Sequence, residues 1–305
     1  MSASRAYADW IAVDWGTTHL RAWAMAEDGT HKAEARSDDG MGVLTRAEFE
    51  PALLRLVEPW LGSRTVPVLV CGMAGSRQGW TEAPYVSVPA KPGELAPVPV
   101  ETRDTRIRVS ILPGLSQSSP SDVMRGEETQ IAGFLAQSPG FDGILCLPGT
   151  HTKWVHLSAE EVVSFQSFMT GELFELLSER SVLRHSVRAV ETDPEAFAEA
   201  VADTLSRPER LAQRLFSIRA ETVLTGLGPE AARARLSGLL IGAELAGARA
   251  YWLGQEVVVA GAPALSALYA AALSAQGVAV RTLDADPLTR LGLAKTWEIQ
   301  RETTS

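Results

Sequence analysis

Apolar residues recur along the chain in short runs, separated by polar turns and by longer segments of helical spacing. Near the N-terminus, the apolar residues 11–13 end at a carboxylate, Asp14, and a polar turn follows before a second alternating strand at 20–24. The same order of strand, turn and strand recurs at 144–155. The pattern therefore predicts two β-hairpins, one in each half of the chain.

The remaining pattern predicts an α/β protein. The continuously apolar residues 66–70 favour a strand buried on both faces, and strands alternate with helices in the second half, which favours a mixed, largely parallel sheet. Further strands are expected at 31–37, 107–111, 152–157, 162–168, 256–260 and 278–283. Helices are expected at 46–61, from 127, from 170, at 194–220, 229–253, 264–276 and 287–300, with a polar linker at 116–122.

The first hairpin carries groups that suit a phosphate. Gly16 lets the backbone approach a ligand closely, and turn amides beside the hydroxyls of Thr17 and Thr18 form an anion-binding concavity. Asp14 would repel a phosphate directly, but it can hold Mg²⁺ through water, and the metal then bridges the phosphate oxygens. The alternative is an ordinary hairpin with an Asx-type turn.

The second hairpin supports the phosphate interpretation. Gly149, Thr150 and Thr152 follow an apolar strand and lead into a new strand that contains Trp154, as in the first copy. Two such hairpins that bind one triphosphate are typical of the nucleotide-binding proteins similar to actin, the heat-shock ATPases and the sugar kinases. We therefore expect ATP as a ligand.

Composition limits the other classes. The 305 residues are 46% hydrophobic, enough for two modest domains, and the net charge of −9 argues against a nucleic-acid partner. The two cysteines lie in apolar strands and are expected to be buried thiols. We find neither a secretory leader nor an apolar run of membrane-spanning length, so we expect a cytoplasmic protein without a membrane partner. The P-loop, the dinucleotide-binding glycine motif and the serine-hydrolase elbow are absent.

A glycine-rich loop follows the buried strand at 66–70. It contains Gly75, Ser76, Arg77 and Trp80, at the carboxyl end of a strand, where α/β sheets usually bind ligands. The alternatives are a turn with structural glycines and a mobile surface loop. We favour a substrate loop, because Arg and Trp are unusual in an ordinary turn.

Two acidic residues, Glu127 and Glu128, open a predicted helix just before the second hairpin. Acidic residues in a first helical turn are common partners of the helix dipole, which is the structural alternative. Their position favours a role in chemistry.

Seven blocks of the sequence together resemble the 2-dehydro-3-deoxygalactonokinase family, from about residue 8 to 297. They are the segments 14–23, 72–80, 124–130, 147–155, 168–173, 237–244 and 257–261. Each block is weak evidence alone, and their order makes the resemblance specific. The family belongs to the actin-like sugar kinases and phosphorylates the terminal hydroxyl of 2-dehydro-3-deoxy-D-galactonate with ATP.

The resemblance implies roles for individual residues. The first phosphate motif matches Asp14, Gly16, Thr17 and Thr18, and the second matches Gly149, Thr150 and Thr152. The adenosine turn matches Gly261 and Ala262, although related kinases usually carry two glycines there. The more distant glycerol and xylulose kinases place a catalytic Asp where Glu127 stands, and a glycine near the terminal phosphates where Gly171 stands.

The acceptor that the resemblance implies is a sugar acid. Its carboxylate calls for an arginine, whose planar fork binds a carboxylate with two hydrogen bonds. Arg77 and Arg125 are the two candidates, and Arg125 is alternatively placed against the phosphates. The expected substrate site thus contains Gly75, Ser76, Arg77, Trp80 and Arg125.

We expect two actin-like (ribonuclease H-like) domains, at 1–137 and 138–305, with the active site in a central cleft, and a last helix able to pack on the first domain. The expected function is ATP- and Mg²⁺-dependent phosphorylation of 2-dehydro-3-deoxygalactonate, with Glu127 as the base, and a homodimer is compatible with it. The alternatives are a kinase for another sugar acid or a ketose, and an ATP-gated sensor without catalysis.

Overall fold

The computed structural model describes residues 7–191 and 193–304. They form two compact units. Unit 1 contains the described residues up to 141, together with 158–164 and those from 285 onward, and unit 2 contains 142–157 and 165–284. The last helix, placed by sequence within the range of the second domain, therefore belongs to the first compact unit.

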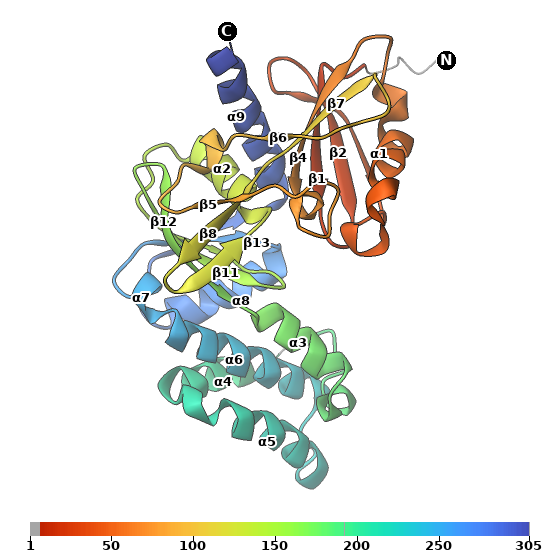
Figure 1. Ribbon diagram of the computed structural model, residues 1–305. Helices are drawn as coiled ribbons and strands as arrows, with labels where there is room; N and C mark the ends of the chain where they lie inside the picture. The colour runs from red at the N-terminus through yellow and green to blue at the C-terminus, as the bar shows by residue number, and fades with distance from the viewer. Residues whose placement is uncertain (1–6, 192, 305) are drawn as a thin grey trace. The chain divides into compact units, whose positions relative to one another are not determined.

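Unit 1 is built on a six-stranded sheet (Figure 1) with the order β3-β2-β1-β4-β7-β6. Its strands are β1 (Trp10–Trp15), β2 (Leu20–Met25), β3 (His31–Ser37), β4 (Val66–Gly72), β6 (Val98–Pro99) and β7 (Ile107–Ile111). Strand β1 pairs antiparallel with β2 and parallel with β4, and β4 pairs parallel with β7. The first predicted hairpin and the strand at 66–70 are thereby confirmed.

Helices cover both faces of this sheet. They are α1 (Phe49–Val57) on one face and α9 (Asp286–Thr304) on the other, and α2 (Glu127–Gln137) packs on α9. The inward residues of β1 alternate, so that Ile11 and Val13 belong to the cluster of α1, whereas Trp10 and Ala12 pack in the cluster that contains Leu293 of α9. Burial on both faces explains why β1 is almost continuously apolar.

A second, three-stranded sheet in unit 1 corrects the prediction of a polar linker at 116–122. It consists of β5 (Tyr85–Ser87), β8 (Gly114–Ser118) and β9 (Ser121–Met124). Strands β8 and β9 pair antiparallel around a turn at Ser119-Pro120. Polar residues such as Gln117 and Asp122 face each other across this hairpin, so its sequence carries little of the apolar alternation that predicts a strand.

Unit 2 repeats the sheet of unit 1. Its sheet consists of β10 (Gly143–Leu147), β11 (Thr152–Ser158), β12 (Glu161–Phe168), β13 (Val257–Gly261) and β14 (Val280–Asp284), in the order β12-β11-β10-β13-β14. Residues 161–164 of β12 fall within unit 1. Strand β10 pairs antiparallel with β11 and parallel with β13, and β13 pairs parallel with β14. Five strands thus have the same order in both units, which is that of an actin-like domain, and the predicted fold class is confirmed.

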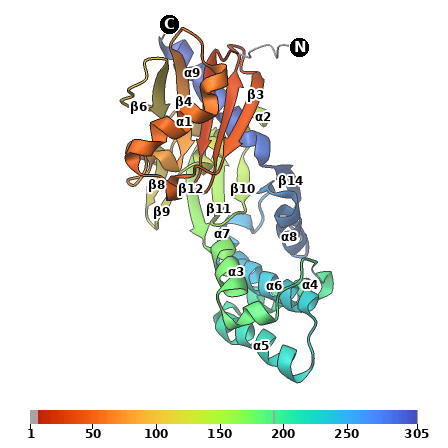
Figure 2. The same cartoon turned by 90° about the vertical axis from the view of Figure 1, so that its right-hand side faces the viewer.

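The helices of unit 2 lie between β12 and β13 and after β13. They are α3 (Thr170–Glu179), α4 (Pro194–Ser206), α5 (Leu211–Leu224), α6 (Pro229–Gly247), α7 (Arg249–Trp252) and α8 (Pro263–Ser274). In Figure 2, α8 lies beside β14, which it contacts. Short 3-10 helices are η1 (Met41–Val43), η2 (Arg46–Glu48), η3 (Glu58–Trp60), η4 (Met73–Gly75), η5 (Pro92–Glu94), η6 (Val182–His185) and η7 (Pro208–Arg210).

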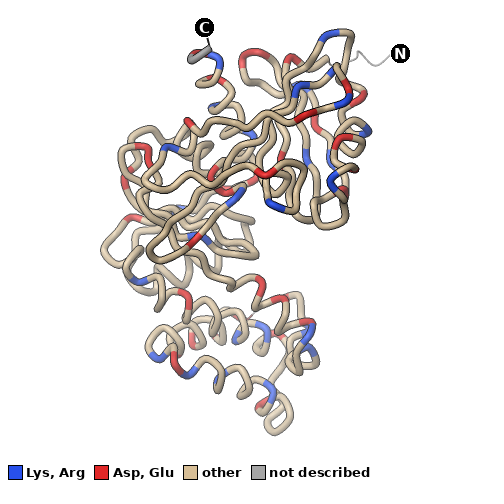
Figure 3. Tube along the Cα trace, viewed as in Figure 1, with Lys and Arg blue, Asp and Glu red and all other residues tan. Residues whose placement is uncertain are grey.

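Close packing of α4 on α6 depends on glycine. A Cβ atom at Gly238 would lie 2.5 Å from the carbonyl oxygen of Phe197, and one at Gly242 would lie 2.4 Å from Oγ1 of Thr204. This confirms that small residues of this helix permit a close neighbour. The charged residues of α4 are all acidic, whereas α5 carries both arginine and glutamate (Figure 3), and charged side chains are expected on surface helices.

The helix predicted over 229–253 is instead divided at Ala248, where α6 ends and the short α7 begins. The turn brings Trp252 into the core, where its indole N–H donates a hydrogen bond of 2.8 Å to the carbonyl of Leu245. Among the described residues, no helix combines the length and the apolar character needed to cross a lipid bilayer.

Candidate nucleotide and substrate sites

The turn of the first hairpin, residues 16–19, is held from two sides. The amide of Gly16 donates to the carbonyl of His19 at 2.9 Å, and the amide of Gly42 donates to the carbonyl of Thr17 at 2.8 Å. Gly40 packs so closely that a Cβ atom there would lie 2.2 Å from the backbone of Thr18. The side chains of Thr17 and Thr18 are exposed. The turn is therefore a braced loop that presents two hydroxyl groups to solvent.

Asp14 is held by an arginine on the neighbouring strand. Arg21 donates from Nε and Nη2 to Oδ2 of Asp14, at 3.2 and 2.8 Å, and from Nη1 to Oδ1 of Asp286 at 2.7 Å. The described residues contain no group of three or more His, Cys, Asp or Glu side chains that could hold a metal ion. A single carboxylate nevertheless fits Mg²⁺, which commonly takes one or two protein carboxylates and completes its shell with water and phosphate oxygens.

Two glycines bring the start of α2 to the carboxyl end of β4. Gly72 has φ of 89° and would place a Cβ atom 2.7 Å from the carbonyl of Trp15, and Gly126 has φ of 106° with its Cβ position 3.6 Å from Cα of Gly72. These positive φ values favour glycine. Glu127, the first residue of α2, accepts a hydrogen bond of 3.1 Å from the amide of Arg125.

Glu128 is a buried carboxyl group, and the sequence did not predict that its environment differs from that of Glu127. Only 1% of it is exposed, and its Oε2 accepts a hydrogen bond of 2.6 Å from the amide of Gly126. Burial raises its pKa to about 8, and the adjacent Glu127 adds to the shift. The pKa of the Cys71 thiol is raised as well, by burial first and then by Asp14 and Glu128. A protonated Glu128 therefore stands beside the predicted base near pH 7.

The glycine-rich loop separates its candidate residues. Arg77 is exposed, whereas Ser76 is 6% exposed and its Oγ has no hydrogen-bond partner among the described residues. The ring of Trp80 packs in the core, with its centre 5.9 Å from that of Trp15 and 6.1 Å from that of Phe49, and Trp80 is also 6% exposed. It completes the apolar cluster beneath α1, and its predicted contact with substrate stays a prediction.

The second arginine candidate lies against this loop. Arg125 donates from Nη2 to the carbonyl of Ala83 at 2.7 Å, and its guanidinium carbon lies 4.3 Å from the centre of the Tyr85 ring. Its Nη1 is buried without a partner in the described part of the chain, and a Cβ atom at Gly75 would lie 2.7 Å from it. The structure thus brings Gly75, Ser76 and Arg125 together.

In unit 2, the start of α3 packs directly on the turn of the second hairpin. A Cβ atom at Gly171 would lie 2.2 Å from the carbonyl oxygen of Gly149, and the amide of Glu172 donates to the carbonyl of Thr150 at 2.9 Å. Thr152 is buried, and its Oγ1 lies 2.9 Å from the hydroxyl of Tyr269. Thr150 is exposed, so it and the amides around it are the groups open to an anion.

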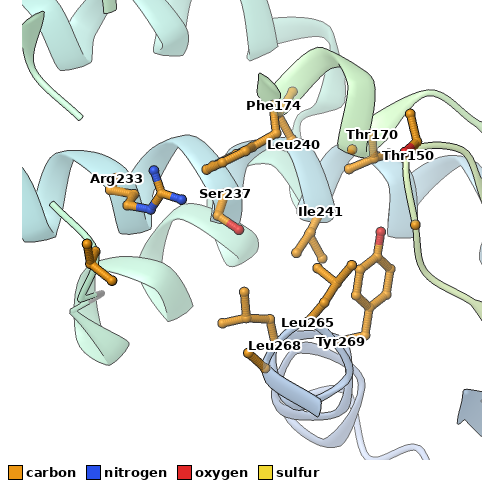
Figure 4. Close-up of a pocket in the computed structure, with 14 residues that line it drawn as sticks. Thr150, Thr170, Phe174, Arg233, Ser237, Leu240, Ile241, Leu265, Leu268 and Tyr269 are labelled. Carbon is orange, nitrogen blue, oxygen red and sulfur yellow. The ribbon is translucent and has the colours of Figure 1, made fainter. Parts of the chain in front are cut away.

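A pocket of about 510 Å³ opens from this turn (Figure 4). It is lined by Gly149, Thr150, Thr170, Gly171, Phe174, Val190, Arg233, Ser237, Leu240, Ile241, Ala264, Leu265, Leu268 and Tyr269. Arg233 lies over the Phe174 ring, 4.9 Å from its centre, at the opposite end from Thr150. A mostly apolar pocket of this volume with a few polar groups is typical of a small-molecule site. Sequence reasoning missed most of its walls, because they come from three separate helices, α3, α6 and α8.

The predicted adenosine turn lies beside the same pocket. Gly261 packs behind the hairpin, with its Cβ position 3.2 Å from the carbonyl of Pro148, and Ala262 caps the helix α8. Neither residue lines the pocket, whose wall begins two residues later at Ala264. They stand at the start of α8, and their predicted contact with adenosine stays a prediction.

The family model of 2-keto-3-deoxy-galactonokinase matches residues 14–296. The chain belongs to the 2-keto-3-deoxy-galactonokinase family. Members of a kinase family transfer a phosphoryl group to an acceptor, here an alcohol, and ATP is the substrate that this family implies. The resemblance inferred from the seven sequence blocks is confirmed.

Relatives of the 2-keto-3-deoxy-galactonokinase family match nearly the full chain. The chain is 41% identical over 291 residues to a probable 2-dehydro-3-deoxygalactonokinase of Rhizobium meliloti, covering 93% of this chain and 95% of that protein. It is 38% identical to the 2-dehydro-3-deoxygalactonokinase of Escherichia coli, with 94% and 96% covered. The crystal structure of a candidate 2-dehydro-3-deoxygalactonokinase from Sinorhizobium meliloti superposes with a TM-score of 0.87 at 40% identity, covering 95% and 99%.

Proposed function

We propose that this protein phosphorylates the terminal hydroxyl of 2-dehydro-3-deoxy-D-galactonate with ATP, giving the 6-phosphate in galactonate breakdown. The proposal that ATP binds in unit 2 rests on one observation: the predicted phosphate-binding residues and the pocket adjoin each other. Gly149, Thr150 and Gly171 belong both to the predicted phosphate-binding residues and to the pocket wall. Backbone amides of the turn would bind phosphate oxygens, and the apolar remainder would bind the nucleoside. The acceptor follows from the names of the relatives.

In this proposal, Glu127 is the base. It would accept the proton of the acceptor hydroxyl as that oxygen bonds to the γ-phosphorus, while the bond from phosphorus to the bridging oxygen breaks and ADP leaves. Positioning and charge neutralisation supply most of the rate, and a carboxylate base contributes roughly 10²–10⁴-fold. Mg²⁺, held by Asp14 through water, would neutralise phosphate charge. Arg77, with Arg125 as the alternative, would bind the acceptor carboxylate.

The deciding measurement is ADP release with and without 2-dehydro-3-deoxygalactonate, repeated with other sugar acids and a ketose. ADP release stimulated only by another acceptor would reassign the substrate, and nucleotide binding without any stimulated turnover would favour a sensor. Glu127→Gln should lower kcat by roughly 10²-fold or more with little change in nucleotide affinity. Glu195→Gln is the control, because Glu195 also stands in the first turn of a helix but is exposed in α4. Normal turnover of the Glu127 variant would contradict its role.

A further inference from the structure

A buried carboxylate in unit 2 is not explained by the phosphate turn or by the core. Glu244, in the last turn of α6, is 3% exposed. Its Oε1 accepts a hydrogen bond of 2.8 Å from the indole N–H of Trp154, and its Oε2 accepts one of 2.8 Å from the hydroxyl of Tyr269 and one from the hydroxyl of Thr170. One side chain therefore joins β11, α3, α6 and α8.

Two of these three partners line the pocket. Thr170 and Tyr269 belong to its wall, whereas Trp154 does not. Figure 4 shows the hydroxyl end of Tyr269 directed toward Thr170, at the end of the pocket where Thr150 lies. Thr170 is also the first residue of α3 and precedes Gly171, which packs on the carbonyl of Gly149. The position of Thr170 thus influences the turn itself.

The direction of these hydrogen bonds has a chemical consequence. Both hydroxyl groups donate their protons to Glu244, so toward the pocket they offer only lone pairs. Thr152 in turn donates to Tyr269, since the proton of Tyr269 is already directed to Glu244. This end of the pocket accordingly has acceptors at Thr170 and Tyr269, opposite the amide donors of the turn.

We propose that Glu244 is a positioning residue of the nucleotide site: it fixes the start of α3 against the phosphate turn and holds the hydroxyls of Thr170 and Tyr269 as hydrogen-bond acceptors toward the ligand. This inference rests on the proposed function of the pocket. Burial of a carboxylate is costly unless its oxygens are paired, and three donors offset that cost here. Burial raises the pKa of Glu244, and the hydrogen bonds from Thr170, Trp154 and Tyr269 oppose that shift.

Glu244→Gln tests this arrangement with almost no change in size. The indole N–H of Trp154 can only donate, so the amide oxygen keeps the Oε1 position and the amide nitrogen takes the Oε2 position. There it donates to Thr170 and Tyr269, whose protons then turn into the pocket. We expect the dissociation constant of ATP to rise roughly 10-fold, the loss of about one charge-assisted hydrogen bond. The KM of the sugar acid should not change.

The partner of Glu244 in α3 gives a second test. Thr170→Val should weaken ATP binding similarly, and Thr170→Ser should bind ATP normally. The double variant Glu244→Gln with Thr170→Val should bind ATP little more weakly than either single variant.

Trp154→Phe is the matched control. It removes the hydrogen bond to the other oxygen of Glu244, away from the pocket, so it should lower the melting temperature without changing ATP affinity. If Glu244→Gln and Trp154→Phe both weaken ATP binding in proportion to their loss of stability, Glu244 has only a structural role and the inference fails.

The pocket itself is tested separately with Ser237→Trp, which fills it from α6. Unchanged ATP binding by this variant would overturn the nucleotide assignment of the pocket. Loss of binding by Ser237→Trp together with normal binding by Glu244→Gln and Thr170→Val would overturn the role of Glu244 alone.

Discussion

At the scale of single residues, the two arginines of the proposed acceptor site differ in what surrounds them. Arg125 is held by the carbonyl of Ala83 and the ring of Tyr85, and its remaining nitrogen is buried. Arg77 is exposed at the end of the glycine-rich loop, where a ligand can reach it. This contrast favours Arg77 as the partner of the acceptor carboxylate and Arg125 as the support of the loop.

We therefore expect Arg77→Ala to raise the KM of the sugar acid by roughly 10- to 100-fold, because a charge-assisted hydrogen bond contributes about 1.5–3 kcal/mol. The KM of ATP should hardly change, and Arg77→Lys should recover only part of the loss, because lysine cannot form the two-pronged contact. Steady-state kinetics of Arg77→Ala and Arg125→Ala, measured side by side, decide the question. An effect on the acceptor KM confined to Arg125→Ala would move the carboxylate site to the start of α2.

Glu128 predicts a pH-dependent stability. Its pKa in the folded chain is about 8, above the ordinary value of 4.5, so the folded state binds this proton more strongly than the unfolded state. The associated stability is present below about pH 4.5 and is lost as pH rises toward 8, at about 1.4 kcal/mol per pH unit within that window.

Glu128→Gln cannot titrate, so its stability relative to the wild type should increase from pH 5 to pH 8. Denaturation midpoints of both proteins at each pH, with Glu195→Gln as the exposed control, measure this difference. Parallel curves for the wild type and Glu128→Gln would show that Glu128 is already ionised in the folded chain at pH 5, which contradicts a raised pKa.

The residue scale also shows where sequence reasoning stops. Asp14 and Gly149 were proposed from turns that the apolar pattern marks, and Glu127 from the resemblance to glycerol and xylulose kinases; their roles stay predictions. The burial of Glu128 and Trp80 was not predicted, because adjacent residues in a sequence can point into different environments. The backbone geometry at Gly126 gives Glu128 an environment that differs from that of Glu127. Packing in the cluster beneath α1 buries Trp80.

At the scale of elements, the contact between α3 and the second hairpin has no room for a side chain. Gly171→Ala would place a methyl group 2.2 Å from the carbonyl of Gly149, so α3 or the turn must move. We expect weaker ATP binding by roughly 10-fold or more, since overpacking commonly costs about 1–3 kcal/mol and the displaced atoms belong to the proposed site. Binding calorimetry measures this directly.

Gly228→Ala is a suitable control for that substitution. It lies in the same unit, and its nearest neighbour would be the flexible end of Glu230 at 3.5 Å. Equal nucleotide affinities of the two variants would place the phosphates away from the start of α3.

Most elements were predictable because their burial produces a regular pattern. The buried strands β1, β4, β10 and β13 were found from continuous apolar residues, and α4 and α6 from helical spacing. The hairpin of β8 and β9 was missed, since its polar residues hide the strand period, and the break at Ala248 was missed because it depends on the tertiary position of Trp252. The pocket could not be predicted, as its wall joins residues 149 to 269.

At the scale of the whole molecule, unit 1 is completed by its most distant segment. Helix α9 packs on α2 through two glycines: a Cβ atom at Gly292 would lie 1.8 Å from the carbonyl of Thr129, and one at Gly133 would lie 2.0 Å from that of Leu288. Trp297 of α9 stacks on Trp10 of β1, with ring centres 4.9 Å apart. The first strand of unit 1 thus depends on a helix that follows it by about 280 residues.

Gly292→Ala should therefore destabilise unit 1 by about 1–3 kcal/mol or more, because backbone would clash with backbone and neither can rotate away. Gly93→Ala is the control, as its nearest neighbour would be the side chain of Ile299 at 3.6 Å. Thermal unfolding followed by tryptophan fluorescence measures this loss of stability. A melting temperature equal to that of the control would mean that α9 can shift along α2 without loss.

The return of α9 to unit 1 also sets an order during translation. The ribosome completes all of unit 2, residues 142–157 and 165–284, before it synthesises the helix that covers one face of the first sheet. Until then, Trp10, Ala12 and Leu69 of that face lack their cover. Domains usually fold from the N-terminus onward as they emerge. Here unit 1 cannot finish folding until α9 is synthesised, so an apolar face of its sheet stays exposed during translation and is accessible to chaperones.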